Sequence, residues 1–544
     1  MPTALAAVPP PDAAAPMYAS GALVEIDLDL SQAALKALKD EPEEYVPGDF
    51  TLSFTDGTPG GPWKPLPSVD KVGVRLKGNV GGSFRPIDDK AAFKVKFNEF
   101  VKGQKFLGLK GMTLNNMVQD PTMLHETLAY EAFRAAEVPA PRTGYAFVRV
   151  NGTAYGVYMN VEGFDDVALA RWFGDFDEDT QHLYEGAYGT DVTPGGAGAF
   201  EVDEGDDENL ADLEALIDAV NADSPAFHTR MEGIADLDEM RRMWGVEKYI
   251  GMWDGYAGTN FPQLPNNFFL YSAGLTGPFQ MFPWGTDMAW EGILDFDGDA
   301  GLMFDECMGD SACRALYMDA LRSVGGTIAG LELDPLATCL LDRLEPWRAM
   351  EVAPYREYDT VGIEEGIADT REMLEERPGE LTAWLEAESG EEEEIVPTGS
   401  AASCAVPDVG FEARPPRANP GEPAAVAKVP AVSVGEIDAP LSLRRLRVEP
   451  PAVIAAVMLA GRAGKASMVG TIVTRRGTRR VCEADRRVPR PGELTMRCRL
   501  TDAARARLQV RRLRVHLAIE FEPADGSPAA TIDRSRVVPR TPRD

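Results

Sequence analysis

Alternating apolar and polar residues mark the first strands of the chain. The run Leu23–Leu28 alternates along its length, and two further runs follow at Val72–Lys77 and Phe93–Phe97. Such alternation predicts strands with one buried face. Along the last of these runs Lys94 and Lys96 share one face, while the apolar residues take the other.

Two pairs of apolar runs are separated by turn residues and predict hairpins. The runs Tyr145–Val150 and Tyr155–Val161 flank Asn151-Gly152, the strongest short signal for a two-residue hairpin turn. The runs Phe268–Tyr271 and Phe279–Phe282 flank a glycine-containing segment in the same way. We therefore expect antiparallel pairs both early and midway along the chain.

Helical periodicity dominates elsewhere in the first 385 residues. Met123 to Glu137 is amphipathic, and Asp120-Pro121-Thr122 supplies its start signal. We also expect helices over Leu210–Val220 and Leu237–Met252, and a mostly helical stretch from Ala315 to Leu385. From about 405 onward, short apolar strands alternate with Pro and Gly turns, a pattern that predicts a small β-sandwich.

Length and charge indicate how the chain divides into domains. A chain of 544 residues is too long for a single hydrophobic core, and its net charge of −33 is distributed unevenly along the sequence. Residues 401–544 hold 26 basic and 15 acidic residues, a net +11, which leaves 28 basic and 72 acidic residues, or −44, in residues 1–400. We expect a flexible leader (1–18), a mixed body (19–385), an acidic linker (386–404) and a basic sandwich-like domain (405–544).

The basic domain leaves two interpretations open. It is either a soluble domain that happens to be rich in arginine, or a domain that docks on an anionic surface, including the acidic body of its own chain. No apolar run reaches about 20 residues, so we expect no membrane-spanning helix. No nucleic-acid partner is expected either.

The cysteines bear on the compartment. They form two pairs close in sequence and two left over: Cys307 with Cys313, Cys482 with Cys498, and then Cys339 and Cys404. Both close pairs are compatible with disulfides, which would imply an oxidising compartment, and the remaining two could pair or stay free. A zinc site of Cys and His ligands is not expected, because there is no Cys-x-x-Cys and there are only four His.

A glycine-rich turn carries the first chemical signal. Gly78, Gly81 and Gly82, with Asn79 between them, precede the lysine-bearing strand. Glycines let backbone amides approach phosphate without a Cβ clash, and the lysines that follow could pair with it. Taken alone, such a glycine cluster is also typical of an ordinary hairpin turn.

An ordered series of motifs between about 70 and 290 resembles the CotH family of spore-coat-type atypical protein kinases. The series stands as Arg75-x-Lys77-Gly78-Asn79, Lys90, Lys96-Phe97, Gly108 to Asn116, Asp120 to Glu126, Ala140-Pro141-Arg142, Asn151-Gly152-x-x-Tyr155-Gly156-Val157-Tyr158, Glu162, Asp165, Leu183-Tyr184, Asp254, Asn266-Asn267-x-x-Leu270-Tyr271 and Pro283-Trp284-x-x-Asp287. The resemblance implies an α+β fold, with an atypical protein-kinase-like two-lobed core before the C-terminal all-β domain. It leaves the residues after 400 unexplained.

The resemblance also implies a nucleotide site. Either Lys90 or Lys96 would hold the ATP phosphates, and Glu126 in the helix after Asp120 would orient that lysine. Glu162 would lie near the nucleotide, between the lobes. The plainer alternative for each is an exposed strand lysine or a solvent-facing helix charge.

By the same resemblance, residues much later in the chain would bind the metal and position the acceptor hydroxyl. Asp254 would position or deprotonate the hydroxyl, although an Asp in an ordinary helix-terminal loop is the alternative. Asn267, or Asn266, and Asp287 would ligate Mg²⁺ or Mn²⁺. The family usually shows Trp-Asp-x-Asp, whereas this chain has Gly285 in place of the first Asp, which keeps an inactive kinase fold in view.

A second acidic cluster follows directly. The spacing of Asp295, Asp297, Asp299 and Glu306 mimics a calcium-binding loop, with Glu306 at the twelfth position. The glycine expected at the sixth position is Ala300, and no clear helix precedes the loop. The hypothesis of a Ca²⁺ site therefore stands beside that of an acidic surface turn.

Three functions remain in competition. The first is an exported kinase that transfers the γ-phosphate of ATP to Ser or Thr of a secreted or surface protein. The second is a catalytically weak or inactive kinase-fold scaffold of a coat or envelope assembly. The third is an acidic Ca²⁺-binding surface protein. The first two place the chain in a secreted, periplasmic or cell-surface location.

Overall fold

The computed structural model divides the chain into two compact units, residues 1–416 and 417–544. It describes residues 12–412 except 79–81, 175, 187, 259–263, 275–276, 293, 299–300 and 359. In the second unit it describes 441–449, 453–460, 463–472, 479–488, 492–501, 504–505, 513–524 and 530–538. Each unit is considered by itself.

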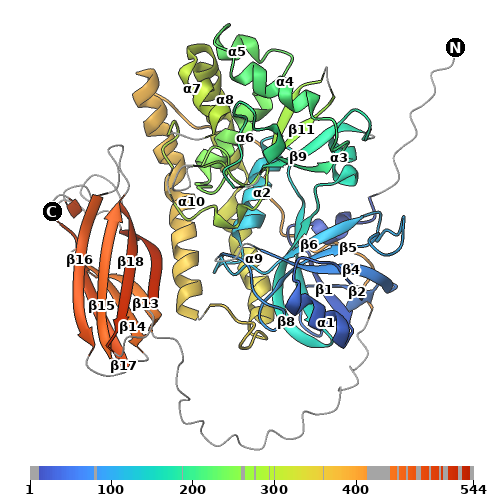
Figure 1. Ribbon diagram of the computed structural model, residues 1–544, viewed down its shortest axis with the longest axis vertical. Helices are drawn as coiled ribbons and strands as arrows, with labels where there is room; N and C mark the ends of the chain where they lie inside the picture. The colour runs from blue at the N-terminus through green and yellow to red at the C-terminus, as the bar shows by residue number, and fades with distance from the viewer. Residues whose placement is uncertain are drawn as a thin grey trace, which may run out of the picture. The chain divides into compact units, whose positions relative to one another are not determined.

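The first unit begins with an eight-stranded sheet that closes on itself (Figure 1). Its strands are β1 (Leu23–Leu30), β2 (Val46–Thr55), β3 (Trp63–Pro65), β4 (Val69–Lys77), β5 (Ala92–Lys96), β6 (Gly111–Asn115), β7 (Thr143–Val150) and β8 (Thr153–Glu162), with α1 (Gln32–Asp40) after β1. The order is β1-β7-β8-β6-β5-β4-β2-β3, and β1 also pairs with β2. Apolar residues of alternate positions, such as Ile26, Val74 and Phe93, fill the barrel-like interior.

The predicted early hairpin is confirmed as β7 and β8. Asn151 and Gly152 form its turn with φ values of 49° and 78°. Two residues with positive φ are what a type I′ turn requires, and Asn-Gly meets that need at low cost. The outward-facing residues Tyr145, Phe147 and Met159 belong to a second core, which they share with helices.

The rest of the first unit is mainly helical, with one further sheet. The helices are α2 (His125–Ala135), α3 (Asp166–Phe173), α4 (Ala211–Val220), α5 (Phe227–Arg230), α6 (Leu237–Tyr249), α7 (Leu302–Gly309), α8 (Ser311–Gly330), α9 (Leu333–Arg348) and α10 (Thr360–Ser389). The sheet has the order β10-β9-β11-β12, from β9 (His182–Gly186), β10 (Glu201–Glu204), β11 (Phe268–Ser272) and β12 (Phe279–Pro283). The predicted hairpin in this region is confirmed as β11 and β12.

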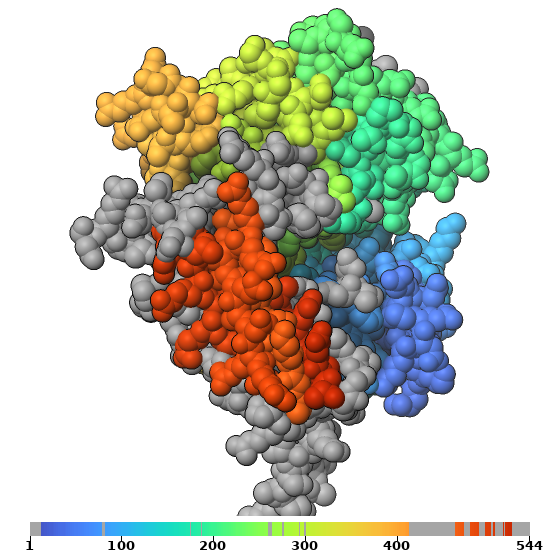
Figure 2. All heavy atoms as spheres, turned by 60° about the vertical axis from the view of Figure 1, so that its left-hand side comes forward, coloured from blue at the N-terminus to red at the C-terminus, as the bar shows by residue number. Residues whose placement is uncertain are grey.

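Helix α2 links the two parts of the first unit. It contacts β7 of the barrel, the helices α6 and α8, and the short 3₁₀ helix η3 (Thr286–Met288). Figure 2 shows the helical part (green to gold) and the barrel strands (blue) side by side on one face of this unit. In the described part of the chain no single helix is long and apolar enough to span a membrane, although α8 and α9, bent by 46°, pass that test as a pair.

Three disulfides join the six cysteines: Cys307–Cys313, Cys339–Cys404 and Cys482–Cys498. The two close pairs are thus confirmed, and the two cysteines left open also pair. The predicted linker 386–404 differs from expectation, because it lies against the first unit. α10 continues to Ser389, Glu393 pairs with Arg322, and the backbone of Thr398 bonds to Gly326.

The predicted leader also differs where the structure describes it. Residues 15–18 form a 3₁₀ helix, and the side chains of Met17 and Tyr18 are buried. The guanidinium of Arg142 stacks on the ring of Tyr18. Alanine and proline content had suggested flexibility, but these two large side chains find partners in the barrel. Residues 1–11 lie outside the described part.

The second unit consists of two antiparallel sheets with one core. The sheets are β13-β14-β17 and β16-β15-β18-β19, from β13 (Leu441–Glu449), β14 (Val453–Ala460), β15 (Gly464–Ile472), β16 (Arg479–Val488), β17 (Gly492–Arg499), β18 (Leu513–Pro523) and β19 (Ala530–Val538). Cys482 and Cys498 connect β16 of one sheet to β17 of the other. Two sheets packed on a shared core are the arrangement of a β-sandwich.

Candidate functional site

Lys77 lies close to the acidic side chains of Glu126 and Asp287. It ends β4, and its Nζ donates to Asn115 Oδ1 over 2.6 Å. The amide nitrogen of Asn115, at the end of β6, donates to Glu126 Oε1 over 2.7 Å. Burial lowers the pKa of Lys77, while the charges of Glu126 and Asp287 oppose that shift. Lys77 thus contacts Glu126 through an amide, with a second carboxylate nearby.

Glu126 lies in the first turn of α2, where the helix dipole favours negative charge. Burial and the charge of Asp287 nevertheless raise its pKa to about 8, although Lys77 and Asn115 act in the opposite direction. Its second oxygen, Oε2, is buried and has no hydrogen-bond partner in the structure. A buried carboxylate oxygen that lacks a hydrogen-bond partner and lies near a second acid is typical of a site that binds a cation.

Asp254 is held by the two asparagines that precede β11. Asn266 Nδ2 donates to Asp254 Oδ1 over 3.1 Å. Asn267 Nδ2 donates to Asp254 Oδ2 over 3.0 Å and to its backbone carbonyl over 2.9 Å. Because both amide nitrogens turn to Asp254, the amide oxygen of Asn267 is free to face another group.

Asp287 completes the group. It lies in η3 after β12, and burial raises its pKa to about 6, with Asp254 contributing in the same direction and Lys77 against it. His125 Nδ1 donates to the Asp287 carbonyl over 3.0 Å, and its Nε2 lies 3.0 Å from the Thr370 hydroxyl oxygen. These two contacts of the imidazole tie η3 to α10.

The glycine at 285 is explained by its backbone and its neighbour. Gly285 has φ +52° and ψ 53°, a left-handed conformation. A Cβ at this position would lie 2.6 Å from Asn267 Oδ1. In this chain, therefore, the amide oxygen of Asn267 occupies the space beside residue 285. The same oxygen is one of the candidate metal ligands.

Comparison with known proteins points to one family. Residues 74–319 match the family model described as "CotH kinase protein". The chain therefore contains a CotH domain. It is also 24% identical over 318 residues to "Inner spore coat protein H" of Bacillus subtilis (strain 168), a match that covers 54% of this chain and 84% of that protein. A shorter match, 31% identical over 74 residues, covers 14% of the chain and 22% of "Inner spore coat protein H-like protein" from the same organism.

The two lysines that were alternatives for binding phosphate both have acidic partners elsewhere. Lys90 is buried and pairs with Glu351 over 2.8 Å, a residue 261 positions away. Lys96 is exposed and pairs with Glu99 over 3.0 Å. Lys77, by contrast, contacts Glu126 through Asn115. Lys77 stands in the motif that carried the resemblance, and it lies on the same face of β4 as Arg75.

Glu162 also differs from expectation. It ends β8 and is fully engaged by two arginines, Arg142 and Arg171. Such a charge-neutralised carboxylate anchors α3 to the barrel and has no oxygen left for a nucleotide. By contrast, the predictions for Glu126, Asp254, Asn267 and Asp287 come together at one place, since each interacts with another member of the set.

The glycine-rich turn is described only in part. Gly78 has φ +121°, and a Cβ there would lie 2.6 Å from the Phe84 nitrogen, so a tight turn requires glycine. The Gly82 carbonyl accepts from Arg85 over 3.0 Å. Asn79 and Gly81 lie outside the described residues, so their predicted role in holding phosphate stays a prediction.

The second acidic cluster of the CotH domain is neutralised within the chain. Glu306 lies in α7 and pairs with Arg230, and Asp297 approaches Arg314 within 3.5 Å. Asp299 lies outside the described residues. Among those that are described, no three His, Cys, Asp or Glu side chains are arranged as a metal site. The calcium hypothesis for Asp295, Asp297, Asp299 and Glu306 gains no support from this arrangement.

Proposed function

We propose that the CotH domain is an atypical protein kinase that transfers the γ-phosphate of ATP to Ser or Thr of a secreted or surface protein. The observation that carries this proposal is the meeting of Lys77, Glu126, Asp254 and Asp287 from four separate elements. A cation aimed at phosphates, an acid that orients it, and carboxylates for a metal are the parts that phosphoryl transfer from ATP requires. The barrel and the helical part would be the two lobes.

Each residue of the proposed site has a role that its contacts support. Lys77 would pair with the phosphates, and Asn115 would hold its ammonium group toward Glu126. Asp254 would accept the proton of the attacking hydroxyl, in an orientation fixed by the two asparagine amides. Positioning and electrostatic stabilisation of this kind account for most of the catalysis in phosphoryl transfer.

The residues present fit a divalent metal. Burial raises the pKa of both Glu126 and Asp287, and like-charge repulsion from a neighbouring carboxylate adds to each shift, from Asp287 for Glu126 and from Asp254 for Asp287. A dication would remove that repulsion, and oxygen ligands are those that Mg²⁺ and Mn²⁺ prefer. Asp287 and Asn267 Oδ1 are the proposed ligands. When bound, the metal would neutralise charge on the transferred phosphates.

A catalytically weak scaffold is the second candidate. Gly285 supports it, because one carboxylate that the family usually carries at this position is absent. The relative named as an inner spore coat protein suggests an assembly role, in a coat or envelope. Both candidates place the protein outside the reducing cytoplasm, since three disulfides would persist only in an oxidising compartment.

The deciding experiment is a thermal-shift titration with ATP, with and without Mg²⁺ or Mn²⁺, followed by phosphate transfer to a generic Ser/Thr substrate. A ligand that binds the native state raises the unfolding midpoint by mass action. We expect a metal-dependent rise that is lost in Asp287→Asn and kept in the matched variant Asp297→Asn. No rise in the wild type at millimolar ATP would contradict the kinase proposal and favour the scaffold.

A further inference from the structure

The loop after α6, residues 251–258, presents Asp254, and a buried carboxylate lies behind it. Glu247 of α6 is fully buried. Its Oε1 accepts the backbone N–H of Tyr256 over 3.1 Å, and its Oε2 accepts that of Ala257. Its backbone carbonyl accepts from Met252 over 2.9 Å. One helix residue therefore bonds both ends of the segment that carries Asp254.

The loop is shaped to admit this carboxylate. A Cβ at Gly255 would collide with Glu247 Oε1, and one at Gly258 would collide with the Met252 carbonyl. The Gly255 nitrogen bonds to the Met252 carbonyl over 3.3 Å, which closes the turn around Asp254. The close approach of loop and carboxylate thus depends on glycine at the position directly after Asp254.

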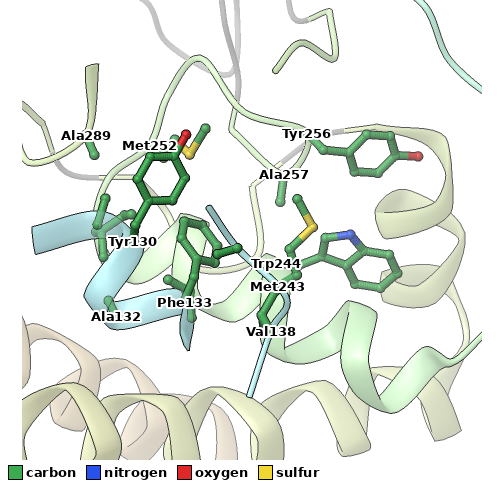
Figure 3. Close-up of a cluster of buried hydrophobic side chains, with 14 of the residues drawn as sticks. Tyr130, Ala132, Phe133, Val138, Met243, Trp244, Met252, Tyr256, Ala257 and Ala289 are labelled. Carbon is green, nitrogen blue, oxygen red and sulfur yellow. The ribbon is translucent and has the colours of Figure 1, made fainter. Parts of the chain in front are cut away.

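The apolar side chains of the loop pack against α2 and α6. In Figure 3, Met252 lies beside Tyr130 and Phe133 of α2, while Tyr256 lies over Trp244 of α6. The Tyr256 and Trp244 rings stack at 6.5 Å between centroids. This packing holds the side chains of Met252 and Tyr256. The backbone amides of Tyr256 and Ala257 are held separately, by the Glu247 carboxylate.

We propose that Glu247 is a positioning residue that holds the 251–258 loop so that Asp254 reaches the acceptor hydroxyl, an inference that rests on the proposed kinase function. A buried carboxylate costs free energy unless its oxygens are hydrogen-bonded. Both oxygens of Glu247 bond to this loop, and an apolar residue would pack α6 at lower cost. The hydrogen bonds of this carboxyl group therefore serve the loop and not the helix.

The first test is Glu247→Gln, with Glu239→Gln as the matched control. Glu239 is a second buried glutamate of α6 that accepts a backbone amide, but its partner is Met281 in β12 and not the loop. In Glu247→Gln an amide group must face a backbone N–H, so one loop bond is lost. We expect kcat to fall about 10- to 100-fold, as a displacement near 1 Å can cause. KM for ATP should stay within about twofold, because Lys77 and Asp287 are untouched.

Gly255→Ala provides an independent test from the other side of the contact. Its methyl group would displace the Glu247 carboxylate and should lower kcat to a similar degree. Because both changes break the same contact, the double variant Glu247→Gln/Gly255→Ala should be no worse than about twofold below either single variant. Multiplicative losses, or a Glu247→Gln enzyme with wild-type kcat, would overturn the proposal.

Hydrogen exchange separates a failure of this inference from a failure of the kinase proposal. In Glu247→Gln the amides of Tyr256 and Ala257 should lose protection, while those in the middle of α6 keep it. If the wild type transfers no phosphate but the two amides respond, the loop contact stands and the kinase proposal falls. If those amides stay protected in Glu247→Gln, the positioning role is refuted whatever the activity.

Discussion

Two groups of acidic side chains in the first unit have opposite surroundings. In the group of Asp254, Asp287 and Glu126, burial and then a neighbouring carboxylate raise the pKa of Asp287 and of Glu126, and the group shares one lysine and three amide side chains. In the group of Asp297 and Glu306, each carboxylate faces an arginine of its own. The family resemblance predicts a metal ligand in the first group, at Asp287, and sequence spacing predicts a calcium site in the second. The two groups differ in charge balance within the fold, because only the second gives each carboxylate its own arginine.

The lysines repeat the contrast. Lys90 has a dedicated buried partner, Glu351, whose carboxylate also accepts the Val157 backbone amide. Lys77 has no such exclusive partner, since Asn115 lies between it and Glu126. A lysine whose charge is fully matched inside the protein stabilises the fold. A lysine whose charge is only partly matched can meet a phosphate.

The largest effect should come from removing the central carboxylate. Asp287→Asn keeps the shape of the side chain but removes its charge, so metal-dependent ATP binding and transfer should fall at least about 100-fold. Glu306→Gln removes a carboxylate of the arginine-matched group and should leave transfer unchanged. Isothermal titration with ATP and Mn²⁺, together with initial rates, would measure both. Equal losses of ATP binding and transfer in the two variants would show that the two groups do not differ in function.

The two lysines should separate activity from stability. Lys77→Met should lower transfer by roughly 100-fold while the unfolding midpoint changes little, because the removed charge is only partly matched. Lys90→Met leaves Glu351 buried and uncompensated, which typically costs about 3–5 kcal/mol of unfolding free energy. Denaturant unfolding and initial rates on both variants would test this. A stable but inactive Lys90→Met would return the phosphate-binding role to Lys90.

Because of the neighbouring carboxylates, the affinity for metal–nucleotide should rise with pH while the unfolding free energy falls. Metal must displace protons from Asp287, whose pKa is about 6, so the affinity for metal–nucleotide should rise roughly 10-fold between pH 5 and 7. Glu126 keeps its proton up to about pH 8 in the fold but loses it near 4.5 when unfolded. The unfolding free energy it contributes is therefore full below pH 4.5 and lost as pH rises to 8.

This pH dependence is checked with two profiles. Nucleotide affinity is titrated at each pH by thermal shift, and the apo protein is unfolded in denaturant over the same range. Glu126→Gln should flatten the stability profile between pH 5 and 8. A stability profile of the variant parallel to that of the wild type would show that Glu126 is not the group responsible.

A smaller effect is expected at residue 285. Gly285→Ala adds a Cβ near Asn267 Oδ1 in a left-handed backbone conformation, so Asn267 must move. We expect a several-fold weaker affinity for Mg²⁺-ATP and a stability loss of about 1 kcal/mol. Gly274→Ala, at a positive-φ position (φ +95°) of the β11–β12 turn, also strains the backbone and serves as the control for stability alone. Tighter metal binding in Gly285→Ala would indicate that glycine there is a defect.

The smallest effect should be that of calcium. The pair Arg230–Glu306 is partly exposed, and pairs of this kind contribute less than about 1 kcal/mol. Glu306→Gln should therefore shift the unfolding midpoint only slightly, and millimolar Ca²⁺ should not stabilise the wild type. Stabilisation by Ca²⁺ that Glu306→Gln abolishes would show that the acidic loop binds the ion in preference to the arginines.

Local patterns in the sequence predict much of the fold, including the helix that carries Glu126. The Asn151-Gly152 hairpin, the α2 helix with Glu126 in its first turn, and the two close cysteine pairs all follow from short stretches of chain. The choice among lysines does not. It depends on Glu351, which lies 261 residues from Lys90 and becomes its neighbour only when the chain after α9 meets β8.

The linker and residues 12–18 of the leader differ from the prediction for a related physical reason. Glutamate- and alanine-rich stretches lack a periodic apolar face, so composition indicates solvated chain. In the fold their few anchoring groups, such as Tyr18 and Glu393, find partners from distant segments. A single cation–π or ion-pair contact to a distant residue leaves no periodic trace in the sequence.

The Cys339–Cys404 disulfide determines how the protein would come apart under proteolysis. It closes a ring of chain across 65 positions, which contains the whole of α10. A cut within the ring, for example at the exposed Val352, would leave both pieces linked until a reductant is added. A cut after residue 412 would instead release the C-terminal unit at once, since the disulfide of that unit, Cys482–Cys498, is internal. Electrophoresis with and without reductant would thus distinguish a cut within the 339–404 ring from a cut in the segment after residue 412.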